Sequence, residues 1–171
     1  MPSKITIQPG SADLAKRFHE CFESVARERV HLASLVAPSL EAIREFTVKA
    51  AEGRNIRMFA VDGSHVVGWC DVFIGQKPGF EHAGNLGMGV LKSYRRQGLG
   101  YRLVRAAIDL VWDEGLTRVE LEVFASNTAV ISLYTKCGFE REGVKRRARY
   151  IDGKYDDIIL MALLREPTSN R

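Results

Sequence analysis

Two Asp-Gly pairs, each set between two runs of strand-forming residues, constrain the fold more than any other feature of the sequence. Asp62-Gly63 lies within residues 56–74, and Asp152-Gly153 separates residues 139–150 from residues 154–164. An Asp-Gly pair between such runs is a strong sign of a tight β-hairpin. The sequence therefore predicts two antiparallel hairpins.

Between the two hairpins the pattern changes from strand to helix and back to strand. Residues 81–91 are predicted to form a strand that contains several glycines, and residues 98–114 place apolar side chains on one stripe of a helix. Residues 117–124 alternate as a strand does. A strand–helix–strand unit implies a crossover connection, so one pair of strands in the sheet is expected to be parallel.

The predicted fold class is α+β, with one domain over residues 1–171 and a flexible tail at residues 166–171. We expect a central twisted sheet of mixed but mostly antiparallel strands, about six to seven of them, flanked by about four helices. The further predicted elements are a strand at residues 4–9 and helices at residues 12–30, 39–53 and 127–137.

Composition bounds the class of protein. A chain of 171 residues suits one domain with a sizeable core, and its 46% hydrophobic and 27% charged residues are typical of a soluble globular protein. The net charge of +4 permits an anionic ligand without requiring nucleic acid. The first residues lack the apolar segment of a signal peptide, and no apolar run is long enough to span a membrane.

The cysteines and histidines argue against a disulfide framework and a metal centre. Cys21, Cys70 and Cys137 are odd in number and far apart, which is typical of reduced thiols in a cytoplasmic protein. The four histidines show no HxxxH or HExxH spacing, so we expect no metal site.

The segment RRQGLG, Arg95–Gly100, places two arginines and two glycines at the start of a predicted helix. The first amide groups of a helix lack partners within the helix, and its dipole adds partial positive charge there. Glycines let an anion approach these amides, so the segment is suited to binding a pyrophosphate. A flexible turn with solvated arginines is an equally open interpretation of these six residues alone.

Two blocks together resemble the Gcn5-related N-acetyltransferases, the GNAT family. Arg95–Gly100 resembles its R/Q-x-x-G-x-G/A motif, and Leu121–Phe139, LEVFASNTAVISLYTKCGF, resembles its strand–Asn–helix–Tyr–Gly-Phe segment. The resemblance covers roughly residues 50–165. It implies an enzyme that transfers the acetyl group of acetyl-CoA directly to a primary amine. The acceptor is a small molecule, such as an amino acid or polyamine, or a protein N-terminus.

The resemblance also implies which residues bind acetyl-CoA. Main-chain groups at the end of the glycine-rich strand are expected to bond pantetheine and the acetyl carbonyl, and the Arg95–Gly100 loop to bind the pyrophosphate. The implied residues are Met88, Gly89, Val90, Leu91, Arg95, Arg96, Gln97, Gly98, Leu99, Gly100, Asn127 and Tyr134.

Asn127 and Tyr134 are seven residues apart, about two helical turns, and therefore share a face of the predicted helix. A carboxamide there can bond the amides of pantetheine. A phenol, with an ordinary pKa of about 10, can donate a proton to the leaving thiolate. The alternatives are a helix N-cap for Asn127 and a half-buried core residue for Tyr134.

Glu122 is the candidate general base. Alternation along residues 118–124 puts Arg118, Glu120 and Glu122 on the face opposite Val119, Leu121 and Val123, and acidic residues there suggest a polar cleft. Some relatives that acetylate protein N-termini have a Glu in a similar context, which implies a proton acceptor acting through a water. An ion pair with an arginine on a neighbouring strand is the open alternative.

The acceptor side is weakly determined. Trp69 and Asp71 share one strand face and, with His82, are candidate acceptor-binding residues, although each is individually typical of a structural position. The basic run Lys145–Tyr150 could meet an acidic substrate or nucleic acid, but a solvated edge strand is the favoured interpretation.

Two rival functions stay open. One is an acyl-CoA-binding sensor of the same fold without catalysis, and the other is a nucleic-acid-binding module. Acidic residues interleaved with the basic ones count against the second, so we expect no nucleic-acid or membrane partner. A homodimer is plausible for the family.

Overall fold

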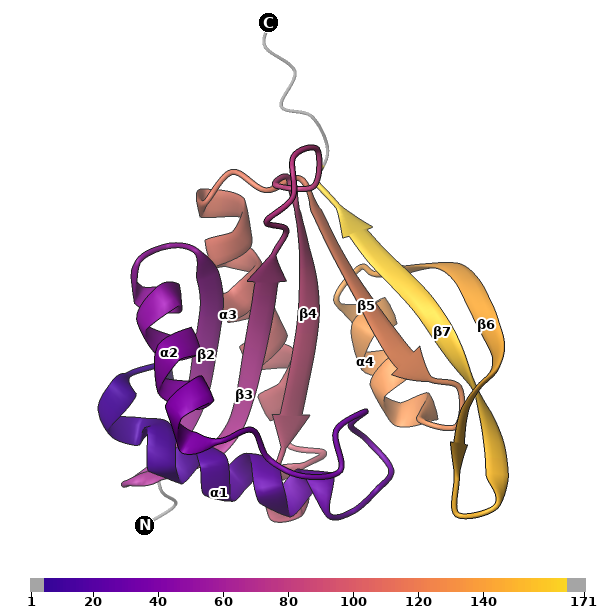
Figure 1. The fold of residues 1–171 in the computed structure, drawn as a ribbon, viewed down its shortest axis with the longest axis horizontal. Helices are drawn as coiled ribbons and strands as arrows, with labels where there is room; N and C mark the ends of the chain where they lie inside the picture. The colour runs from indigo at the N-terminus through magenta and orange to yellow at the C-terminus, as the bar shows by residue number, and fades with distance from the viewer. Residues whose placement is uncertain (1–4, 166–171) are drawn as a thin grey trace, which may run out of the picture.

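The computed structural model describes residues 5–165, and within them one seven-stranded sheet has the order β1-β2-β3-β4-β5-β7-β6 (Figure 1). The strands are β1 (Thr6–Pro9), β2 (Asn55–Asp62), β3 (His65–Ile74), β4 (Ala83–Val90), β5 (Arg118–Phe124), β6 (Glu140–Ile151) and β7 (Lys154–Leu164). The α-helices are α1 (Ala15–Ala26), α2 (Leu40–Ala51), α3 (Leu99–Asp113) and α4 (Thr128–Lys136). The predicted tail at residues 166–171 lies outside the described residues.

Strand pairing confirms the mixed sheet. Both Asp-Gly pairs form hairpin turns: Asp62 pairs with His65 between β2 and β3, and Ile151 pairs with Lys154 between β6 and β7. The α3 crossover makes β4 and β5 parallel, and every other pair in the sheet is antiparallel. The predicted basic edge strand is also confirmed, because β6 ends the sheet and most of its residues are exposed.

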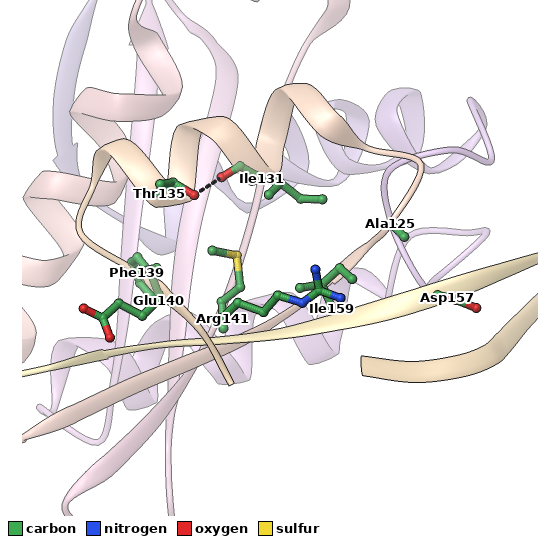
Figure 2. A pocket seen from close by; sticks show the side chains of 9 residues that line it. Ala125, Ile131, Thr135, Phe139, Glu140, Arg141, Asp157 and Ile159 are labelled. Carbon is green, nitrogen blue, oxygen red and sulfur yellow. Dashed lines mark hydrogen bonds between the residues drawn. The ribbon is translucent and has the colours of Figure 1, made fainter. Parts of the chain in front are cut away.

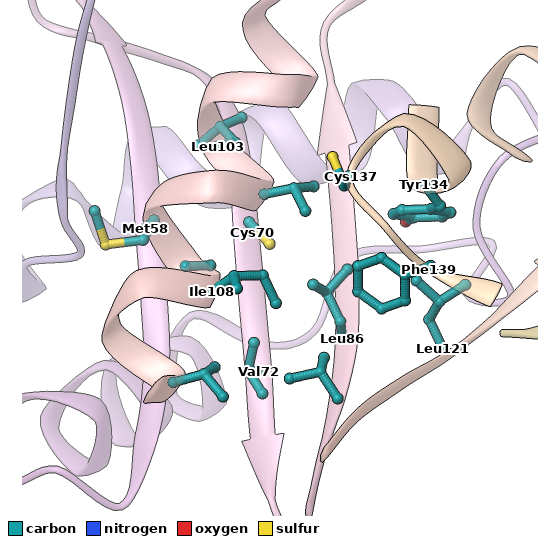
Figure 3. Packing of buried hydrophobic residues seen from close by; sticks show 14 of the residues in the cluster. Met58, Cys70, Val72, Leu86, Leu103, Ile108, Leu121, Tyr134, Cys137 and Phe139 are labelled. Carbon is teal, nitrogen blue, oxygen red and sulfur yellow. The ribbon is translucent and has the colours of Figure 1, made fainter. Parts of the chain in front are cut away.

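Helices cover the two faces of the sheet unequally. Helices α1 and α2 lie on one face over β2 and β3, and α3 and α4 lie on the other (Figure 1). Side chains of α3 and α4 share the larger core with β2–β5 and β7, as Leu103, Tyr134 and Leu121 do in Figure 3. The smaller core, under α1 and α2, contains Phe18 and Trp69.

The first helix is shorter than predicted. The sequence suggests a helix over residues 12–30, but α1 ends at Ala26 after a short 3-10 turn at Ala12–Leu14. Arg29 has a left-handed backbone, with φ at 59°, which a continuing helix does not allow. The Glu23 carboxylate accepts a 2.7 Å hydrogen bond from the Ala37 N–H, which holds the returning chain against α1. We call residues 27–39, between α1 and α2, the α1–α2 segment.

Cys21, Cys70 and Cys137 are free thiols in the structure, and all three are buried. Among residues 5–165, none of the helices is both long and apolar enough to cross a lipid bilayer.

Candidate active site

Strands β4 and β5 separate after a short contact. They pair only where Ala83–Asn85 lie beside Arg118–Glu120, and the remainder of each strand runs apart from the other (Figure 1). A parallel pair normally continues its ladder, so the divergence leaves one edge of β4 without its neighbour. We call this gap in the strand pairing the opening; it lies between the ends of β4 and β5, and α3 begins shortly after β4 ends.

Main-chain groups of β4 face this opening alternately. The Leu91 N–H donates to the Val67 carbonyl at 2.9 Å, so the main-chain N–H of Leu91 points towards β3 and away from the opening. In an antiparallel ladder, alternate residues turn their N–H and C=O groups to opposite sides. Those of Val90 and Met88 therefore face the opening, and the Val90 carbonyl accepts a 2.8 Å bond from Arg95 Nε. Of the predicted main-chain ligands in Met88–Leu91, Met88 and Val90 have the suitable direction.

The loop that follows β4 has two left-handed residues. Arg96 has φ at 61° and Gly98 has φ at 76°, immediately before α3 begins at Leu99. A left-handed backbone is costly for a non-glycine residue and recurs at ligand-binding loops. A Cβ atom on Gly98 would meet nothing within 4 Å, so backbone conformation and not packing requires glycine there.

Gly100 is required for a different reason. A Cβ atom at this position would lie 2.9 Å from Leu133 Cδ2 and 3.3 Å from Met88 Cε. The glycine therefore lets α3 pack closely against α4 and β4, beside the opening. This packing role is separate from the one that the sequence suggests, in which the glycine lets a phosphate approach the first amides of the helix.

The two loop arginines have different surroundings. Arg95 donates two hydrogen bonds, of 2.5 and 2.8 Å, to the carboxylate of Glu28 in the α1–α2 segment. These bonds hold the pKa of Glu28 below its usual value, although its partial burial opposes that shift. Arg96 forms no ion pair or side-chain hydrogen bond with the described residues, so its guanidinium is the one available to an anion.

His31 of the α1–α2 segment crosses to the far side of the opening. Its Nε2 lies 3.1 Å from Arg95 Nη1 and 3.4 Å from Glu28 Oε2, and its Nδ1 lies 3.2 Å from Asn127 Nδ2. A guanidinium only donates, so Nε2 accepts and the proton of the neutral ring is on Nδ1. This Nδ1–H needs an acceptor, which the Asn127 carboxamide supplies when its oxygen, and not its nitrogen, faces the ring. Burial, and then the charge of Arg95, lower the pKa of His31, which keeps the ring neutral at pH 7.

Asn127 is the residue before α4, but its side chain makes no capping bond. Asn127 is therefore the N-cap residue of α4 by position, as the alternative expects, but without a side-chain capping bond. The carboxamide is buried and directed to His31 instead. It lies at the opening between the end of β5 and α4, where the sequence places it.

Tyr134 is almost fully buried, with 5% of its surface exposed, and packs beside Phe139 with ring centroids 5.6 Å apart (Figure 3). It is more deeply buried than the half-buried alternative expected. Burial raises the pKa of its phenol, and the nearby Cys70 and Cys137 raise it further. Cys70, Cys137 and the Tyr134 ring all belong to the larger core.

Glu122 lies on the sheet face that α4 does not cover. Its carboxylate bonds Lys145 Nζ of β6, so the predicted ion pair exists but with a lysine in place of an arginine. Glu120, on the same face, bonds Arg118. These acids line an uncovered face of the sheet.

The three predicted acceptor residues do not come together. Trp69 is buried against Phe18 and Phe22, and Asp71 gives both carboxylate oxygens to Arg57, at 2.7 and 2.8 Å. Burial raises the pKa of Asp71, and the bonds from Arg57 oppose that rise. His82 precedes the start of β4, about 26 Å from its far end at a strand's rise per residue. These positions favour structural roles for Trp69 and Asp71 and separate His82 from the opening.

Sequence reasoning did not predict the contacts that Glu28, His31 and Arg149 make. Glu28 and His31 lie in the first 50 residues, which the two motifs do not cover, and they meet Arg95 and Asn127 across more than 60 residues of chain. No local sequence pattern predicts such contacts. Arg149 lay within a noted basic run, but a shift in register between Lys145 and Arg149 hides which face it occupies.

A separate hollow of about 600 Å³ lies between α4 and the β6–β7 hairpin (Figure 2). Ile131, Ile159 and Met161 form its apolar wall, and Arg141 and Asp157 are among its polar residues. None of the predicted site residues lines it. It is therefore distinct from the opening between β4 and β5.

The sequence of this chain is similar to those of known acetyltransferases. The model of the acetyltransferase (GNAT) family matches residues 15–139. The L-amino acid N-acetyltransferase AaaT of Escherichia coli K12 is 34% identical over 104 residues, which are 60% of this chain and 63% of AaaT. The E. coli K12 [ribosomal protein bS18]-alanine N-acetyltransferase is 40% identical over 70 residues, 41% of this chain and 47% of that protein. The alignments thus span about half to two thirds of these relatives.

Solved structures agree over nearly the whole chain. A GNAT-family acetyltransferase of Streptococcus pneumoniae superposes with a TM-score of 0.89 at 27% identity, covering 94% of this chain and 99% of that one. The yncA protein of Salmonella typhimurium, solved with acetyl-CoA, has the same fold, with a TM-score of 0.88, 15% identity and 96% coverage of both chains. From the family match and the shared fold, this chain belongs to the GNAT family of acetyltransferases.

Proposed function

We propose that this protein is an acetyl-CoA-dependent N-acetyltransferase that moves the acetyl group directly to a primary amine. The observation that carries the proposal is the divergence of β4 and β5 beside a left-handed loop at the start of α3. Relatives that act on L-amino acids and on a ribosomal protein support amine acceptors of both kinds.

The residues around the opening fit acetyl-CoA. Met88 and Val90 offer main-chain groups to pantetheine and to the thioester carbonyl, where an N–H donor would stabilise the developing oxyanion. The loop before α3, with Arg96 and the first amides of the helix, suits the pyrophosphate. Asn127 suits an amide of pantetheine once its contact with His31 is exchanged.

The proposed reaction is a direct transfer. The neutral amine attacks the thioester carbon, forming the C–N bond, and the C–S bond then breaks to release CoA. The proton of the attacking amine passes through a water to Glu122. The Glu122 carboxylate also pairs with Lys145, so it bonds the water and this ammonium group together. No covalent enzyme intermediate is required.

Tyr134 is the proposed partner of the departing sulfur. Because burial raises the pKa of the phenol well above that of a thiol, full proton transfer to the thiolate is unfavourable. A hydrogen bond donated by the neutral phenol stabilises the developing thiolate without completing the transfer. We therefore propose a donor role for Tyr134 in place of the complete protonation expected from its ordinary pKa.

The cytoplasmic location and the homodimer stay predictions. Neither is needed for the chemistry above.

The experiment is an assay of CoA thiol release from acetyl-CoA with a panel of amines, accompanied by a calorimetric titration with acetyl-CoA. Binding together with amine-dependent release would support the proposal. Binding without release from any small amine or N-terminal peptide would favour the acyl-CoA sensor. Absence of binding would contradict the site assignment.

A further inference from the structure

We propose that Arg149 binds the carboxylate of the acceptor, so that the enzyme selects free amino acids over amines that lack an adjacent carboxylate. The inference rests on the proposed function and names its acceptor class. It concerns the face of β5, β7 and β6 that α4 does not cover. Figure 1 shows α1 and α2 over β2–β4, and no helix over this face.

Arg149 is fixed at the edge of that face by two contacts. Its guanidinium carbon lies 4.0 Å from the ring centroid of Phe124, the last residue of β5. Its Nη2 donates a 2.7 Å hydrogen bond to the Arg29 carbonyl of the α1–α2 segment. A guanidinium has five N–H groups, so most of its donors stay available after this bond. Stacking on an aromatic ring orients the fork for a planar anion.

The acids near Arg149 are bonded elsewhere. Asp156, its cross-strand neighbour on β7, bonds the main chain and hydroxyl of Ser126. Asp152 bonds the guanidinium of Arg29 through both oxygens, at 2.8 and 3.1 Å, and Arg149 acts on it only at longer range. No carboxylate of residues 5–165 lies within 4.0 Å of an Arg149 nitrogen.

Three other basic side chains are already paired. Arg95 bonds Glu28, Arg118 bonds Glu120 and Glu142, and Lys145 bonds Glu122. Arg149 therefore leaves a positive charge on this face that its neighbours do not neutralise by direct contact. Arginine also binds a carboxylate through two parallel bonds, which a lysine ammonium does not do.

The position relative to Glu122 defines the acceptor. Glu122 and Phe124 are two residues apart on β5 and face the same side, so their Cα atoms are separated by about 6–7 Å. An amine near Glu122 and a carboxylate on the guanidinium above Phe124 would be close neighbours. An α-amino acid has this arrangement of charges. A peptide N-terminus has a neutral amide where the amino acid has its carboxylate.

The test compares each of several L-amino acids with its own amide in the CoA-release assay. We expect the wild-type kcat/KM to be at least tenfold higher for the acid than for the amide. Arg149→Gln should lower kcat/KM for the acids about ten- to a hundredfold, mainly through KM, and leave the amides unchanged. Arg149→Lys should restore part of the loss.

The matched control is Arg146→Gln, which removes an exposed positive charge from the same strand. It should leave the acid-to-amide ratio unchanged, and activity with amides shows that Arg149→Gln still folds. Two results would overturn the role of Arg149 but not the proposed function. One is a wild-type kcat/KM as high for the amides as for the acids, and the other is an equal loss of kcat/KM for both in Arg149→Gln. Absence of CoA release with all acids, amides and N-terminal peptides would contradict the proposed function as well.

Discussion

The two halves of the sheet differ in how many of their faces are covered. Strands β2 and β3 lie between α1 and α2 on one face and α3 on the other, whereas β5, β7 and β6 have a helix, α4, on one face only (Figure 1). The divergence of β4 from β5 separates the two halves. The proposed chemistry lies at this boundary.

Charged residues behave differently in the two halves. In the covered half, Arg57 and Asp71 have 5% and 6% of their side chains exposed, and Arg57 also bonds Thr47 and lies 4.2 Å from the Phe46 ring centroid. In the open half, Lys145 and Glu122 are about half exposed. From the sequence alone, Asp71 and Glu122 are both candidate site residues. In the structure, Asp71 belongs to the buried core of the covered half, whereas Glu122 in the open half is accessible to a ligand.

The largest expected effect breaks the buried pair. Asp71→Ala leaves the Arg57 guanidinium buried without its partner, and we expect the free energy of unfolding to fall by about 3–5 kcal/mol. Glu142→Ala, which breaks a surface pair with Arg118 in the open half, should cost about 1 kcal/mol or less. Urea denaturation measures both. Equal losses would show that the two halves do not differ in this respect.

The next effect concerns the phenol at the boundary. Tyr134→Phe removes the proposed hydrogen bond to the departing sulfur and should lower kcat about 10²-fold, with little change in acetyl-CoA affinity. Tyr150→Phe, which removes an exposed phenol from β6, is the control and should leave kcat unchanged. An unaltered turnover number in Tyr134→Phe would remove this residue from the mechanism.

A smaller effect is expected at Glu122. Glu122→Gln keeps the size of the side chain but removes its capacity to take a proton, so kcat/KM should fall about tenfold or more near neutral pH. Glu120→Gln changes an acid on the same strand face that bonds Arg118, and should have no such effect. If the pH profile of kcat/KM is the same in Glu122→Gln as in the wild type, Glu122 is not the general base and its role is limited to the ion pair with Lys145.

The smallest effect is the pH dependence of stability due to His31. The folded state lowers its pKa, so the unfolded chain binds the proton more readily, and stability is lost as pH falls from about 6.5 towards the lowered value. Glu28 and Arg95 are the charged groups in contact with the ring. His31→Gln should flatten this part of a thermal-unfolding profile, and an unchanged slope would contradict the assignment.

Much of the fold could be predicted from the sequence because its signals are local. The Asp-Gly turns, the apolar stripe of α3 and the alternation of β5 each depend on neighbouring residues, and all appear in the structure. The end of α1 could not be predicted, because contacts of the α1–α2 segment, such as Glu23 with Ala37, decide it.

The site could be predicted less well than the fold. The loop before α3 and the helix that carries Asn127 and Tyr134 form where the two sequence motifs place them. The roles of these residues in binding and catalysis stay predictions. The partners of these residues come from elsewhere: Glu28 binds Arg95, and His31 reaches Asn127. Trp69 and Asp71 are individually typical of structural positions, but their shared strand face also suggests an acceptor pocket; the structure buries both.

The most direct test of the account is a calorimetric titration of acetyl-CoA into Gly98→Ala and Gly115→Ala, which alter the two ends of α3. Both glycines have a left-handed φ, 76° and 83°, and a Cβ atom on either meets nothing within 4 Å. Each substitution should therefore cost a similar 1–2 kcal/mol of stability. We expect Gly98→Ala to weaken acetyl-CoA binding at least tenfold and Gly115→Ala to leave it unchanged. Equal affinities in the two variants would contradict the claim that the loop before α3 binds acetyl-CoA.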